Sequence, residues 1–91
     1  MHKNIDRETI SKRLNRVEGQ VRGVNKMVKS GKSCEEILIQ ISSAKSSLHK
    51  TGQMLLEWHM HNCVIEGIRK GKGDQVMKKL SSAIEQFSRI I

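Results

Sequence analysis

The sequence predicts an all-α protein of three helices with a long central helix, and three observations support this. The chain has no proline, and clusters of turn-forming residues stand only at 30–33 and 71–73. Between these clusters, apolar residues recur at intervals of three and four, which is the repeat of a helix that buries one face. With 91 residues, we expect residues 1–91 to form one domain.

The first helix is expected between Asp6 and Ser30. Its apolar positions are separated by four and three residues in alternation, as in a helix that packs on other helices. These positions are Ile10, Leu14, Val17, Val21, Val24 and Val28.

The second helix is expected to begin at about Cys34, because Ser33 and Glu36 form a capping box. No strong stop follows before residues 71–73, which gives roughly 37 residues, or about 55 Å at 1.5 Å per residue. We interpret Gly52 within it as a close helix crossing and not as an end. A helix this long cannot bury its apolar stripe against two shorter neighbours, so it should pair with another subunit.

The third helix is expected to be capped by Asp74. Its apolar stripe comprises Val76, Leu80, Ile84 and Phe87, with Ile90 and Ile91 at its end.

Composition limits the partners. The chain carries 17 Lys and Arg against 9 Asp and Glu, a net charge of +8, which points to an anionic partner. Trp58 and Phe87 are the only aromatic residues, so binding of single strands by base stacking is not expected.

No apolar run is long enough to span a bilayer and the N-terminus has no apolar signal region, so we expect a cytoplasmic protein without a membrane partner.

Three residues suggest a metal site shared between subunits. His59 and Cys63 are four residues apart, on one face of the second helix. Cys34 is 25 residues upstream, about 37 Å along the same helix. If two copies of this helix pair antiparallel about a two-fold axis near residues 47–49, Cys34 of one chain lies opposite His59 and Cys63 of the other.

The nature of these ligands favours Cu(I). Two thiolates and one imidazole form a soft set that suits Cu(I), whereas structural zinc would need a fourth ligand, from His61 or His2. The start of a helix also favours the thiolate form of Cys34. Cysteine and histidine residues can equally be packing or surface residues, and this alternative stays open at this point.

Basic residues of the first helix form a candidate DNA surface: Lys12, Arg13, Arg16 and Arg22, with Gln20 beside them. A run of charge on a helix is usually a solvated face. The charge of +8, multiplied in an oligomer, favours contacts with DNA phosphates instead.

Three stretches of the chain resemble the CsoR/RcnR family of metal-sensing bacterial repressors: RLNRVEGQVRG at 13–23, SCEEILIQISSA at 33–44 and HMHNC at 59–63. The resemblance implies an all-α dimer of dimers without a helix-turn-helix. It also implies a repressor that binds operator DNA when empty and releases it when its inducer binds.

Within this family the ligand set indicates the inducer. Cys34, His59 and Cys63 match the copper sensors, whereas nickel and cobalt sensors typically have histidine in place of Cys63. Persulfide sensors lack the histidine at position 59, and formaldehyde sensors lack the cysteine at position 63. The resemblance therefore implies Cu(I) as the inducer, with nickel, cobalt or a thiol-reactive compound as alternatives.

Four further residues can be compared with the family. Arg13 matches a DNA-contacting arginine of the family, and His2 is near an N-terminal histidine that some nickel and cobalt sensors use. Glu35 and Lys79 differ from the residues common in copper sensors.

Two other classes of function compete with a repressor. A small metal-storage protein or chaperone could use the same three ligands, and its basic surface would then be incidental. A thiol enzyme with Cys34 as nucleophile ranks last, because the chain offers no Gly-rich loop and no oxyanion-stabilising device. We therefore expect no enzymatic activity and no small-molecule substrate.

Overall fold

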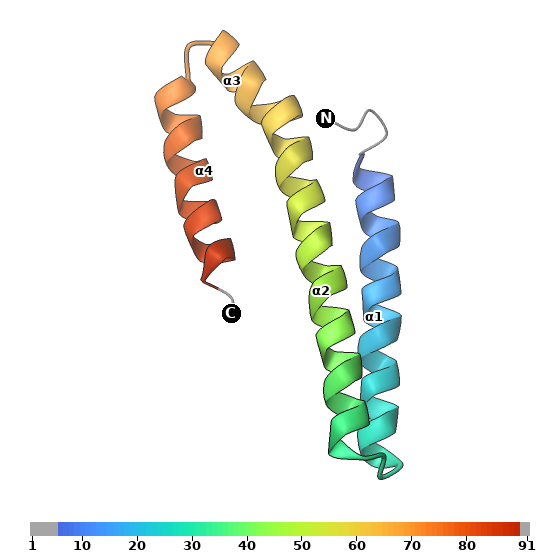
Figure 1. Ribbon diagram of the computed structural model, residues 1–91. Helices are drawn as coiled ribbons and strands as arrows, with labels where there is room; N and C mark the ends of the chain where they lie inside the picture. Colours follow the sequence, from blue (N-terminus) through green and yellow to red (C-terminus); the bar gives the residue numbers. More distant parts are fainter. Residues whose placement is uncertain (1–5, 90–91) are drawn as a thin grey trace. The chain divides into compact units, whose positions relative to one another are not determined.

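The computed structural model describes residues 6–89, apart from the side chain of His61. Within that range the elements are α1 (Arg7–Lys29), α2 (Cys34–His59), a π-helical segment (Met60–Val64, hereafter the π segment), α3 (Ile65–Arg69) and α4 (Gly73–Ser88), shown in Figure 1. Since α2, the π segment and α3 follow one another without a break, the prediction of three helices with a long central one is confirmed. The chain divides into two compact units, Met1–Met54 and Leu55–Ile91.

Helix α1 has a well-defined cap at each end. At its start, the Asp6 carboxylate accepts the backbone N–H of Thr9 at 2.8 Å, which satisfies one of the free donors of the first turn. At its end, Gly31 has a φ of 78°, and the N–H of Lys32 donates to the carbonyl of Met27 at 3.0 Å. A left-handed glycine with this bond ends a helix sharply, so the chain reverses here.

Helix α2 begins at Cys34, as we predicted from the capping residue Ser33. The Ser33 hydroxyl accepts the backbone N–H of Glu36 at 3.1 Å, and Cys34 is the first helical residue. Gly52 lies inside the helix and does not end it, as expected.

The first unit is an antiparallel pair made by α1 and the part of α2 up to residue 54, which run side by side in Figure 1. Its buried residues are Ile10 and Val17 from α1 with Ala44 and Thr51 from α2. The spacing of seven residues is the same on both helices, which is the repeat of two helices packed along one seam. The buried Thr51 hydroxyl donates to the carbonyl of Ser47 at 2.9 Å, so its polar atom is satisfied within the helix.

The second unit contains the end of α2, the π segment, α3 and α4. Gly71 has a φ of 79°, and the N–H of Lys72 donates to the carbonyl of Gly67 at 2.8 Å, so α3 ends with the same motif as α1. Helix α4 then packs back on α3 and the π segment. Val64 and Leu80, 2% and 4% exposed, are the buried residues of this unit.

The prediction that Asp74 caps the last helix is wrong. Lys72 occupies the capping position, Gly73 is already helical, and Asp74 lies in the first turn of α4. The reason is that the left-handed turn at Gly71 reverses the chain early. Asp74 still places its negative charge near the positive end of the helix dipole. Ile90 and Ile91, expected at the end of this helix, lie outside the described residues.

A single chain covers only part of its apolar stripes. On α1, the exposed fraction is 44–57% for Leu14, Val21 and Val28. On α2, it is 44–51% for Ile41, Leu48 and Leu55. Among the described residues, no helix is long and apolar enough to cross a membrane.

Candidate metal centre and basic surface

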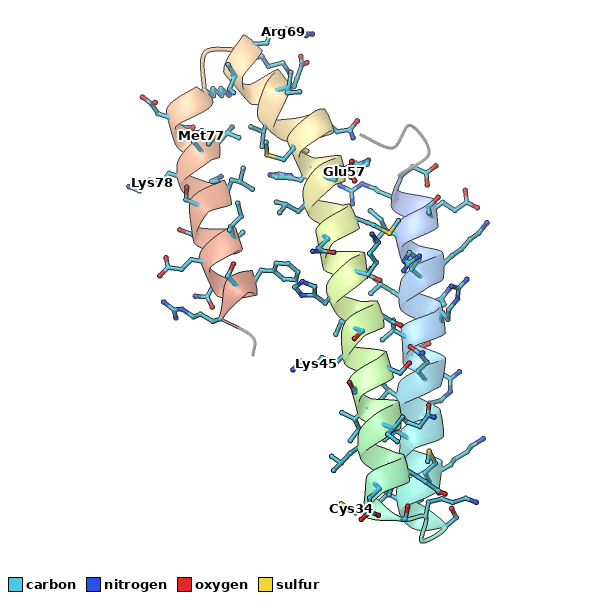
Figure 2. The ribbon with its side chains drawn as sticks, in the orientation of Figure 1. Cys34, Lys45, Glu57, Arg69, Met77 and Lys78 are labelled. Carbon is cyan, nitrogen blue, oxygen red and sulfur yellow. The ribbon has the colours of Figure 1, made fainter. Side chains whose placement is uncertain are left out.

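Cys34 is an exposed thiol at the first position of α2. Figure 2 shows it beside the turn that joins α1 to α2. The hydrogen bond from Glu36 to Ser33 fixes where the helix starts, and with it the place of Cys34. The sulfur is therefore held on a rigid element and remains accessible to a second molecule.

His59 and Cys63 are both half-buried and lie where the central helix changes its hydrogen-bond pattern. His59 is the last residue of α2, and Cys63 belongs to the π segment. The backbone N–H of Ile65 donates to the carbonyl of Met60, five residues earlier, instead of four as in an α-helix. The sequence spacing predicted an ordinary α-helical turn between the two residues, whereas the structure has a wider π turn here.

Asn62 is a residue of this region that the sequence analysis missed. Its side-chain amide nitrogen, Nδ2, donates to the backbone carbonyl of Trp58 at 2.9 Å. The bond ties the π segment to the residue just before His59. Asparagine is known to bond nearby backbone groups, but periodicity alone gives no sign of this bond.

The described part of one chain does not contain a complete metal centre. No three side chains of His, Cys, Asp or Glu are grouped there as a metal would require. A metal held by His59 and Cys63 would therefore need a further ligand from another source. His2 and the side chain of His61, both named as additional ligands, lie outside the description.

The candidate basic residues of α1 differ in their surroundings. Lys12 and Arg22 are exposed and form ion pairs with Glu8 at 3.6 Å and Glu18 at 3.4 Å. Such exposed pairs contribute about 0–1 kcal/mol, so both side chains can exchange their partner for a phosphate at little cost. Arg16 is exposed and belongs to no ion pair among the described residues.

Arg13 and Gln20 form a different kind of feature, because both are half-buried. The Nε of Arg13 and the Oε1 of Gln20 are buried, and neither has a hydrogen-bond partner in the described chain. A buried polar atom without a partner costs about 1–3 kcal/mol, and because the chain itself covers these two atoms, an outside partner reaches them only after the side chains move.

The positions on α1 separate these residues into two faces. At about 100° per residue, Arg13, Arg16 and Gln20 fall within about 60° of one another, beside the apolar stripe, with Lys12 at their edge. Arg22 falls on the opposite side of the helix. Four of the five candidates therefore share one strip.

The chain is similar over most of its length to known transcriptional repressors. A protein family described as metal-sensitive transcriptional repressors matches residues 6–89. The copper-sensing transcriptional repressor CsoR of Bacillus subtilis is 37% identical over 92% of this chain and 83% of its own length. The copper-sensing transcriptional repressor RicR of Mycobacterium tuberculosis is 36% identical over 93% of this chain and 88% of its own.

Two solved structures share the fold. The crystal structure of the copper-sensing repressor CsoR with Cu(I), from Geobacillus thermodenitrificans, has a TM-score of 0.87 and 44% identity, and the match covers 97% of this chain and 92% of that one. The nickel-responsive transcriptional regulator InrS has a TM-score of 0.80 and 30% identity, with 96% and 98% covered.

Proposed function

This chain belongs to the family of metal-sensitive transcriptional repressors, and from this we propose that it is a copper-responsive repressor of the CsoR branch. Without metal it binds operator DNA, and it leaves the DNA when Cu(I) binds. The observation that carries the proposal is the set of two thiols and one imidazole on the central helix. This set is soft enough to select Cu(I), and the relatives described above are named for copper sensing.

The proposed Cu(I) ligands are Cys34 from one chain and His59 with Cys63 from another. Helix α2 runs from Cys34 to His59 without a break, and its rise of 1.5 Å per residue keeps the two ends apart. A second copy in antiparallel orientation supplies the missing ligand at each end. The exposed position of Cys34 and the uncovered apolar residues of α2 support this pairing.

The apolar residues left uncovered on one chain also bear on the assembly. The exposed stripes of α1 and α2 suit a homodimer whose two halves form further contacts, a dimer of dimers as in the family. We infer that residues 1–91 act together as one DNA-binding and metal-sensing domain, in the cytoplasm, without enzymatic activity.

The proposed DNA contacts lie on α1. Arg13, Arg16, Lys12 and Gln20 share one strip, and Arg22 adds charge from the other side. Arginine and lysine supply phosphate contacts, and glutamine can contact a base. The net charge of +8 supports an anionic partner at this strip.

Binding of metal and binding of DNA oppose each other, because both depend on how the chains of the assembly are arranged. A ligand set shared by two chains fixes the relative position of their helices, and so biases which arrangement of the basic strips is populated. By linkage, DNA must weaken Cu(I) binding by the factor by which Cu(I) weakens DNA binding, typically about 5- to 150-fold.

The test is to titrate apo protein and Cu(I)-loaded protein against promoter DNA at one fixed salt concentration. We expect a weaker complex with the Cu(I) form, and no difference for Cys34→Ala, which lacks one thiolate. Equal affinities of the two wild-type forms would overturn the copper-sensor proposal. A metal-storage protein or chaperone would fail to shift promoter DNA in either form.

Nickel is the second candidate, because the nickel-responsive regulator InrS has the same fold at 30% identity. The titration is therefore repeated with Ni(II), Co(II) and Zn(II), and with an aldehyde and a persulfide donor. Release by Ni(II) or Co(II) alone, lost in His2→Ala, would assign the protein to the nickel and cobalt sensors.

A further inference from the structure

We propose that Asn62 is a positioning residue for the metal ligands: its side-chain amide holds the π segment, which sets Cys63 relative to His59. The proposal deepens the function proposed above and rests on it for the identity of the metal. Its structural part, the support of the π segment by Asn62, stands without any metal.

The hydrogen bond lies at the place where it can act on both ligands. Asn62 is next to Cys63 inside the π segment, and its Nδ2 donates at 2.9 Å to the carbonyl of Trp58, next to His59. One bond therefore connects the two neighbours of the candidate ligands across the point where the helix widens.

The π segment matters for the direction of Cys63. A π turn pairs each carbonyl with the N–H five residues on, so the residues that follow are rotated by about one residue, or about 100°, relative to an uninterrupted α-helix. Cys63 lies within this turn and takes part of the rotation. A change of the segment to an α-helix would turn the thiol away from its present direction relative to His59.

A second contact anchors the segment from its other end. Val64 follows Cys63 and is 2% exposed, in a unit where α4 packs against the π segment. Burial of Val64 and the Asn62 bond thus hold the two sides of Cys63. Short π segments of this kind occur frequently at functional sites, and groups that orient a metal ligand typically change affinity by about 10- to 100-fold.

The decisive variants are Asn62→Ala, which removes the donor, and Asn62→Thr, which restores one. Helix α2 shows that a threonine can do this, because the Thr51 hydroxyl donates to the carbonyl four residues earlier at 2.9 Å. Asn25→Ala, at an exposed position of α1, is the matched control for the loss of an asparagine from a helix.

The first readout is amide hydrogen exchange of the apo protein at Val64 and Ile65. We expect exchange to be about two- to tenfold faster in Asn62→Ala, the loss of one hydrogen bond, and close to wild type in Asn62→Thr and Asn25→Ala. Unchanged exchange in Asn62→Ala would overturn the support of the π segment, whether or not the protein binds copper.

The second readout is Cu(I) affinity, measured by competition with a chelator, with the sulfur and nitrogen ligands counted by X-ray absorption. We expect Asn62→Ala to weaken binding about 10- to 100-fold and Asn62→Thr to recover most of the loss, with the DNA affinity of the apo forms unchanged. Faster exchange together with wild-type Cu(I) affinity would overturn the positioning role. Absence of Cu(I) binding in wild type would contradict the proposed function instead, and the exchange data would still decide the role of Asn62 in the π segment.

Discussion

Gly67 in α3 and Val76 in α4 approach each other so closely that a Cβ atom on Gly67 would overlap the Cγ2 atom of Val76. The two helices can pack at this distance only because residue 67 has no side chain. The contact lies close to the turn at Gly71, so it sets how α4 folds back on α3 and the π segment.

Gly67→Ala is therefore expected to destabilise the protein by about 1–3 kcal/mol, the usual cost of overpacking. This loss is expected even though alanine is a better helix former than glycine by about 1 kcal/mol. Urea unfolding followed by circular dichroism would measure it.

Two further variants control this experiment. Gly23→Ala adds the same methyl group in α1, where nothing lies within 4 Å of the new atom, and should stabilise the protein. The double variant Gly67→Ala/Val76→Ala should recover part of the loss. Stabilisation of Gly67→Ala equal to that of Gly23→Ala would show that α3 and α4 do not pack this closely.

Helix boundaries could be predicted from the sequence because single residues determine them. Ser33 gave the start of α2, and Gly31 and Gly71 adopt the left-handed conformation expected at helix ends. The prediction for Asp74 was wrong because several residues near a turn can cap a helix. Which residue takes the capping position depends on where the turn at Gly71 ends.

The π segment could not be predicted, because its apolar pattern fits an α-helix equally well. The Asn62 bond within the helix leaves no mark in the apolar pattern, and the burial of Val64 is a feature of tertiary packing. The pairing of His59 with Cys63 as ligands rests on their spacing of four residues and stays a prediction. Their third partner, Cys34, remains a prediction, because only a second chain can bring it to them.

Ser33→Ala should weaken the start of α2. The variant loses the bond from the Glu36 N–H to the Ser33 hydroxyl, and loss of an N-cap costs about 1 kcal/mol. Ser33→Asp keeps an acceptor at this position and should unfold at nearly the wild-type urea concentration. If Ser33→Ala unfolded like wild type, the cap would contribute nothing to the helix that carries Cys34.

Asp6 should make stability depend on acid pH. The backbone N–H of Thr9 donates to its carboxylate and holds the pKa of Asp6 below its ordinary value of 3.8. The contribution of this cap is therefore fully present above pH 3.8 and is lost as the pH falls through the lower folded-state pKa. Asn caps a helix without titrating, so Asp6→Asn should show a smaller loss of thermal stability on acidification. Parallel curves for the two proteins would remove Asp6 as a cause.

Self-association should depend on the exposed stripe of α2. Four copies of a 10.4-kDa chain would sediment as a species of roughly 42 kDa. Leu48 is 51% exposed in the single chain and lies at the expected two-fold axis, so Leu48→Glu would bury a charge and should dissociate the assembly. Ser46→Glu introduces the same charge on the opposite face of α2 and should leave the sedimentation coefficient unchanged. A folded wild-type monomer at micromolar concentration would contradict the shared metal site.

DNA binding should depend on the strip of α1 that contains Arg13 and Arg16. Contacts with phosphates release counterions, so the affinity for operator DNA should fall steeply with salt. Arg13→Ala and Arg16→Ala should each weaken binding and lower the slope of log affinity against log salt by about one, without a change in Cu(I) affinity. Arg89→Ala is the matched control, because Arg89 is paired with Glu85 at 3.0 Å on α4. An equal loss of affinity in all three variants would mean that net charge, and not this strip, determines binding.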